Sequence, residues 1–110
     1  MKTDSTIYHF ALCEDWESQL KNENYFPSAF LKEGFIHCSK ENQLDGVLNR
    51  FFKDEDKVVL LTIDSNKIIA ELKLEQASNG DFFPHIYGEI NKTAIYDVEI
   101  ISVNNFQKRV

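Results

Sequence analysis

Three histidines, His9, His37 and His85, are the residues of this sequence whose type is best suited to chemistry. Each lies at the edge of an apolar, strand-like segment, and imidazole exchanges protons near neutral pH more readily than any other side chain. Because rings that are distant in sequence can meet in space, we predict a common cleft in which all three act as catalytic residues. The alternative for each ring is a buried, hydrogen-bonded position or an ordinary surface position.

A metal centre is the second use of three histidines. Zinc motifs usually contain two ligands close together in sequence, such as His-x-x-x-His or Cys-x-x-Cys, and no such pair occurs here. His37 and Cys38 are adjacent, so on a strand their side chains point to opposite faces and do not readily share one ion. We therefore assign no metal ligands, and a convergent site of three imidazoles remains an alternative.

Four further side chains are predicted to contact a ligand: Tyr8, Ser39, Arg50 and Tyr87. Arg50 could hold a carboxylate or a phosphate, and Tyr87 could donate a hydrogen bond or stack on a base. Ser39 precedes a predicted helix whose first N–H groups could bind an anion, and a simple helix cap is the alternative role for its hydroxyl. Cys38 could be a nucleophile activated by a histidine, although its apolar neighbours favour an inert buried thiol. Among 18 acidic residues the sequence singles out no general base.

Hydrophobic periodicity predicts the strands that must position these side chains. Segments rich in β-branched or alternating apolar residues lie at 6–12, 35–38, 58–63, 70–75 and 95–103. The run 58–63 is nearly continuous in apolar residues, which is typical of a central strand covered on both faces. The aromatic segment 82–88 is interrupted by Pro84 and Gly88, so we expect an irregular loop or an edge strand there.

Two main helices are predicted in the N-terminal half of the chain. The first begins near Glu14, and its apolar stripe repeats at every fourth residue, at Leu12, Trp16 and Leu20. The second runs from Lys40 to about Phe52, with Ser39 as its N-cap. Its apolar face is formed by Leu44, Val47, Leu48 and Phe51. Helices early in the chain followed by several strands predict an α+β fold.

Composition and charge place the chain in the globular class. Its 110 residues, 43% hydrophobic and 13% aromatic, predict one domain, residues 1–110, with one core. The formal charge of −6 argues against nonspecific nucleic-acid binding, which depends on clustered Lys and Arg. Neither an export signal nor a membrane span is found in the sequence. We therefore expect a cytoplasmic protein in which Cys13 and Cys38 are reduced.

Three blocks of the sequence form a specific combination: Ile7-Tyr8-His9, Glu33-Gly34-Phe35-Ile36-His37-Cys38-Ser39 and Phe83-Pro84-His85-Ile86-Tyr87-Gly88. Together they resemble a small bacterial and plant family known as domain of unknown function family 952. Asn49-Arg50-Phe51 and the strand Leu60-Leu61-Thr62-Ile63-Asp64 also lie where the pattern of that family places them. The resemblance covers nearly the whole chain.

The resemblance implies a fold similar to the ADP-ribosyltransferase-like α+β domains. In these a split pair of small antiparallel or mixed sheets forms a cleft for NAD or a related nucleotide. A histidine of the first strand commonly holds the nicotinamide ribose there, a role that the resemblance assigns to His9. His37 and Ser39 are similar to the histidine-and-serine strand of RNA 2′-phosphotransferases in that superfamily.

The predicted function is a histidine-lined cleft that binds NAD, a nucleotide or another small phosphorylated ligand, with a transferase reaction as one use of it. His9 and His37 would position ribose or phosphate oxygens, and His85 would act as acid or base. Two alternatives stay open: a noncatalytic protein-interaction module that uses the aromatic residues of segment 82–87, and a metal-binding protein that uses the three histidines. The sequence does not indicate an oligomeric state.

Overall fold

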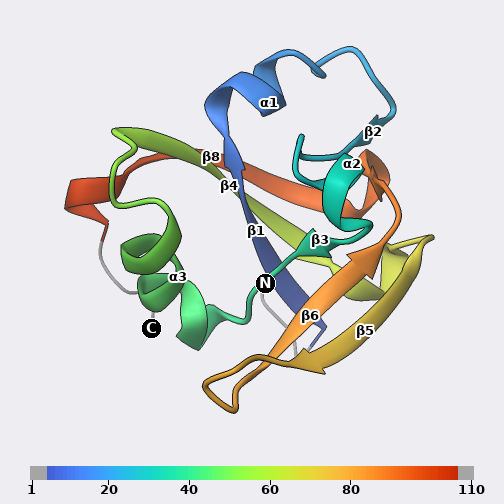
Figure 1. The fold of residues 1–110 in the computed structure, drawn as a ribbon. Helices are drawn as coiled ribbons and strands as arrows, with labels where there is room; N and C mark the ends of the chain where they lie inside the picture. The colour runs from blue at the N-terminus through green and yellow to red at the C-terminus, as the bar shows by residue number, and fades with distance from the viewer. Residues whose placement is uncertain (1–4, 107–110) are drawn as a thin grey trace.

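Two antiparallel sheets of three strands and a two-stranded ribbon form the fold in the computed structural model, which describes residues 5–106 (Figure 1). The α-helices of the described residues all lie before residue 52. The prediction of a mixed α+β fold with small sheets and few helices is confirmed.

The larger sheet has β4 (Lys57–Asp64) between β1 (Thr6–Leu12) and β8 (Ile95–Ser102). Residues 58–63 of β4 are all buried, as predicted for a central strand. One face of this sheet packs against α3 (Leu44–Phe51), and the other packs against the smaller sheet. Most of the core therefore lies between the two sheets.

The smaller sheet has β6 (Phe82–Tyr87) between β3 (Ile36–His37) and β5 (Glu71–Gln76). The prediction of a loop or edge strand at 82–88 is therefore wrong, because β6 is the central strand. Pro84 is tolerated there because its nitrogen faces Cys38, the residue after β3, so the missing N–H costs only one bond at the end of this pairing. Its carbonyl still accepts a hydrogen bond from the backbone N–H of Cys38 at 2.9 Å.

Short elements connect and cover the sheets. The ribbon pairs β2 (Asn24–Tyr25) with β7 (Ile90–Asn91). The remaining α-helices are α1 (Cys13–Glu17) and α2 (Phe30–Glu33). Single 3₁₀ turns occur at η1 (Glu41–Gln43), η2 (Ser65–Lys67), η3 (Lys92–Ala94) and η4 (Val103–Asn105).

The first helix is shorter than its apolar stripe predicts. It ends at Glu17, and Leu20 is 60% exposed instead of packed. The side chain of Gln19 donates to the carbonyl of Phe26 at 2.7 Å and accepts from the N–H of Phe26 at 3.1 Å. These two bonds hold the chain in a turn, so the helical register is lost before Leu20.

The second helix packs through Leu44 and Leu48 as predicted, but not through Phe51. Phe51 is 70% exposed because the helix ends there. The next residue, Phe52, leaves the helical conformation with φ −127° and packs on Phe10, with ring centroids 5.7 Å apart.

Ser39 does not cap the second helix. Its backbone forms an antiparallel bridge with Tyr8, in which each N–H donates to the other carbonyl, at 2.7 and 2.8 Å. The helix begins instead with η1, where Oε1 of Gln43 accepts from the N–H of Lys40 at 2.8 Å. Ser39 is extended because it belongs to the joint between the two sheets.

Gly88 is required by a close approach between two segments. A Cβ at position 88 would lie 2.6 Å from Cβ of Ala70, so Gly88→Ala must displace the chain. We expect a loss of about 1–3 kcal/mol in the free energy of unfolding, measured with urea. Gly46→Ala is the matched control, because its Cβ meets nothing within 4 Å. The helical control should gain about 0.5–1 kcal/mol, and equal stability of the two variants would contradict the steric explanation.

Candidate functional site

Strand alternation gives the smaller sheet an apolar inner face and a polar, aromatic outer face. On the inner face, Ile36 and Ile86 pack in the core. On the outer face, His37 lies opposite His85, and His85 lies opposite Lys73. Aromatic contacts and hydrogen bonds join these residues to their neighbours on the same face. We call the resulting set the outer-face cluster: Phe35, His37, Lys73, Glu75, His85 and Tyr87.

A carboxylate on the neighbouring strand holds His85. Nδ1 of His85 lies 2.7 Å from Oε1 of Glu75, and the hydroxyl of Tyr87 donates to the same oxygen at 2.5 Å. The bond from Tyr87 and then that from His85 lower the pKa of Glu75, and the bond to Glu75 raises the pKa of Tyr87. Glu75 is therefore an ionised acceptor, and the proton of neutral His85 is on Nδ1.

This tautomer leaves the lone pair of His85 on Nε2. Nε2 makes no hydrogen bond with residues 5–106, and it is not among their enclosed polar atoms, so it reaches solvent. The side chain as a whole is only 14% exposed, and Phe35 stacks on it with ring centroids 4.5 Å apart. The ring thus has the Glu75 carboxylate at Nδ1 and a solvent-accessible lone pair at Nε2, which is the arrangement of a general base.

His37 places a second imidazole beside the first. The two ring centroids are 5.0 Å apart, in an edge-to-face arrangement. Nε2 of His37 lies 3.2 Å from a carboxylate oxygen of Glu33, and the side chain is 59% exposed. Phe35 contacts this ring as well, at 4.8 Å between centroids. Two imidazoles, each beside a carboxylate, can supply and remove protons in one reaction.

His9 lies in the core and does not share the outer face. Its Nδ1 donates to the backbone carbonyl of His37 at 2.7 Å, and its Nε2 lies 3.3 Å from the hydroxyl of Tyr25. Burial lowers the pKa of His9 to about 4, although the bond to the His37 carbonyl opposes this shift. The structure thus brings His37 and His85 together but separates His9 from them, so a cleft lined by all three rings is not formed.

The other predicted site residues divide between the core and the surface. Tyr87 belongs to the outer-face cluster, and Arg50 is exposed on α3. Tyr8 and Ser39 are buried in the core, so the structure does not place them where they would contact a ligand. Cys38 is also buried, and burial raises the pKa of its thiol, which opposes the role of nucleophile.

The residues that hold the two histidines were not found from the sequence. Glu75 is one of 18 acidic residues, and its relation to His85 depends on the register between β5 and β6. Lys73 places its Nζ 4.9 Å from the ring centroid of Tyr87, which is also a cross-strand contact. The contact between Glu33 and His37 could have been predicted from the sequence, because the two residues are four positions apart.

The three-histidine metal centre is not formed. Within residues 5–106, no group of three or more His, Cys, Asp or Glu side chains is arranged to hold a metal ion. Both ring nitrogens of His9 are already used in contacts inside the core.

Comparison with known proteins identifies the family. Residues 11–98 match the family described as Protein of unknown function (DUF952), and the chain belongs to it. In fold it is similar to protein CC0527 from Caulobacter crescentus. The crystal structure of that protein has a TM-score of 0.78 at 23% identity, covering 86% of this chain and 84% of that chain. Its solution NMR structure has a TM-score of 0.75 at 22% identity, covering 89% and 85%.

A search of curated proteins gives no match. None of the helices within residues 5–106 has the length and apolar character needed to cross a bilayer.

The buried position of His9 predicts an acid-sensitive fold. Its pKa is about 4 in the native state and near the ordinary 6.5 in the unfolded chain, so between these values only the unfolded chain binds the proton. Stability should therefore fall as the pH drops from 6.5, by about 3 kcal/mol once the pH is below 4. Urea unfolding of the wild type and of His9→Asn at several pH values measures this.

The His9→Asn variant should lose this part of the pH dependence, while its amide can still donate to the His37 carbonyl. The control is His85→Asn, which removes an imidazole that does not contribute to the pKa shift of His9 and should leave the acid sensitivity in place. A His9→Asn protein whose stability falls with pH as steeply as that of the wild type would refute the assignment.

Proposed function

We propose that this chain has an ADP-ribosyltransferase-like fold and that it binds a nucleotide, with NAD as the first candidate, at the outer-face cluster. In this proposal the cluster transfers a group from the nucleotide by acid and base catalysis. The split arrangement of two small antiparallel sheets supports the fold assignment. The two adjacent imidazoles on one of these sheets support the choice of reaction.

The hydrogen bond between Nδ1 of His85 and Glu75 carries the proposal. It fixes the tautomer, so that Nε2 can accept a proton from an attacking hydroxyl group. Tyr87 donates to the same carboxylate and keeps its orientation fixed. The ring of His37 lies beside the ring of His85, and His37 would position ribose or phosphate oxygens.

The residues of the cluster fit a ligand with a flat base and a sugar. Phe35 and Tyr87, with ring centroids 5.3 Å apart, offer aromatic surface beside the two imidazoles. Lys73 adds a positive charge on the same face. NAD would supply an ADP-ribosyl group with nicotinamide as the leaving group. The chain itself would supply orientation and the proton acceptor.

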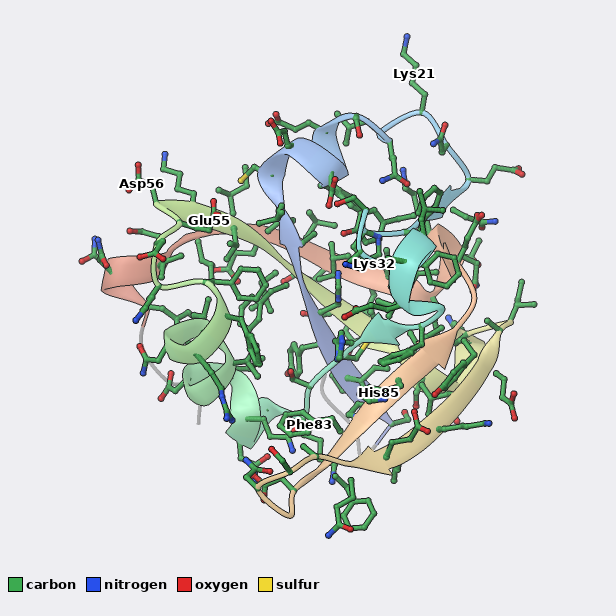
Figure 2. The ribbon with its side chains drawn as sticks, in the orientation of Figure 1. Lys21, Lys32, Glu55, Asp56, Phe83 and His85 are labelled. Atoms are coloured by element: carbon green, nitrogen blue, oxygen red, sulfur yellow. The ribbon has the colours of Figure 1, made fainter. Side chains whose placement is uncertain are left out.

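The test separates binding from turnover. Ligand-observed NMR with NAD and ADP-ribose measures binding, and chromatography of released nicotinamide measures the reaction. His85→Asn keeps a donor toward Glu75 but removes Nε2, so we expect release to fall about 10²- to 10⁴-fold with little change in binding. Lys21→Gln is the control, because Lys21 projects from the opposite end of the molecule from His85 (Figure 2).

Two results would overturn the proposal in different ways. If neither nucleotide binds at millimolar concentration, the ligand class is wrong. If NAD binds and nicotinamide is released equally fast by the wild type and by His85→Asn, His85 is not the base.

A further inference from the structure

An open groove of about 410 Å³ lies between α3 and the turn that joins β5 to β6. The side chain of Gln43 connects the two walls by donating to the carbonyl of Phe82 at 2.9 Å. The residues of the groove that matter below are Lys40, Gly46, Arg50, Asp81, Phe82 and Phe83. Of these residues, only Phe82 and Phe83 lie on a strand that also carries residues of the outer-face cluster, β6.

Two cations in the groove, Lys40 and Arg50, have no acidic partner within residues 5–106. The ion pairs found among residues 5–106 are those of His37 and His85, so neither Lys40 nor Arg50 is neutralised within that range. Asp81 is the one carboxylate among the described residues that line the groove. The groove thus carries a local excess of positive charge in a chain whose net charge is −6, which favours an anionic ligand.

Gly46 is a glycine that the fold itself does not require. Its φ is not positive, and a Cβ added to it would meet nothing within 4 Å. A glycine inside a helix costs roughly 0.5–1 kcal/mol relative to alanine. Because Gly46 lines the groove, the absent side chain leaves space beside Arg50, one turn further along the same helix. A ligand that needs this space would explain a residue that otherwise only weakens α3.

Phe83 places one wall of the groove on the strand that carries His85. Phe83 lines the groove and lies two residues before His85 on β6, so the two side chains are on the same face, about 7 Å apart along the strand. Figure 2 shows Phe83 on the α3 side of His85. A ligand that lies in the groove beside Phe83 would therefore approach the part of β6 that carries His85.

We infer that this groove is the phosphate subsite of the nucleotide whose reacting group lies at His85. This inference rests on the proposed function and specifies its ligand. Arg50 and Lys40 hold the phosphate oxygens by charge-assisted hydrogen bonds. Phe82, which is 47% exposed, packs against the base or the ribose.

Adenosine 5′-monophosphate and adenosine differ only in the phosphate and are the probes. Calorimetric titration of the wild type should show tighter binding of the monophosphate. Arg50→Gln should weaken that binding about 10- to 100-fold, as expected for loss of a charge-assisted bond, and should leave adenosine binding nearly unchanged. Lys21→Gln removes one positive charge elsewhere and should change neither affinity.

Gly46→Met provides a second variant that does not alter charge. Its side chain would fill the groove, so binding of the monophosphate should be lost while the urea midpoint of unfolding stays at or above that of the wild type. Amide NMR shifts of Gly46 and Gly80 on addition of the monophosphate should report contact with the groove directly.

The outcomes distinguish the subsite from the proposed function. If Arg50→Gln and Gly46→Met bind the monophosphate like the wild type, while His85→Asn still loses nicotinamide release, the subsite is refuted and the proposed function stands. If the wild type binds neither the monophosphate nor NAD, both are overturned. Equal affinity of the wild type for the monophosphate and adenosine refutes the subsite alone.

Discussion

One hydrogen bond in the core determines the geometry of the surface site. Nδ1 of His9 on β1 donates to the carbonyl of His37 on β3. Close to this bond, the backbones of Tyr8 and Ser39 exchange two hydrogen bonds. Because β3 is only two residues long, these contacts with β1 and the pairing with β6 fix its position. Through them, the exposed ring of His37 is held next to His85. His9 is therefore a positioning residue, and the neutral form that burial imposes on it can keep its donor on Nδ1.

Carboxylates lie beside the two imidazoles of the outer-face cluster, and two cations line the groove. Glu75 and Glu33 each place a carboxylate oxygen beside an imidazole, where it can orient the ring. The cations Lys40 and Arg50 line the groove, where no neighbouring carboxylate among the described residues pairs with them. In the proposed function, this separation of the two signs would let an anionic ligand bind next to the base despite the net charge of −6.

The hydrophobic periodicity of the sequence was sufficient to predict strands and a helix whose apolar residues pack in the core. The strands β1 and β4 and the early part of α3 lie where their apolar patterns place them. The failures have specific causes in tertiary structure. Pro84 is accommodated in a central strand because its missing N–H lies at the end of the pairing with β3, opposite Cys38. The link between Glu75 and His85 depends on cross-strand register, which no local pattern encodes.

The three histidines differ in exposure because the strands that carry them differ in burial. Residues 7–11 of β1 are all buried, so this strand is covered on both faces and His9 is only 6% exposed. His37 stands between buried Ile36 and buried Cys38, and His85 stands between two buried residues of β6. Alternation then directs both rings to the outer face. A histidine between buried neighbours in an alternating strand is thus available for chemistry, whereas the same residue in a fully buried strand holds the fold together.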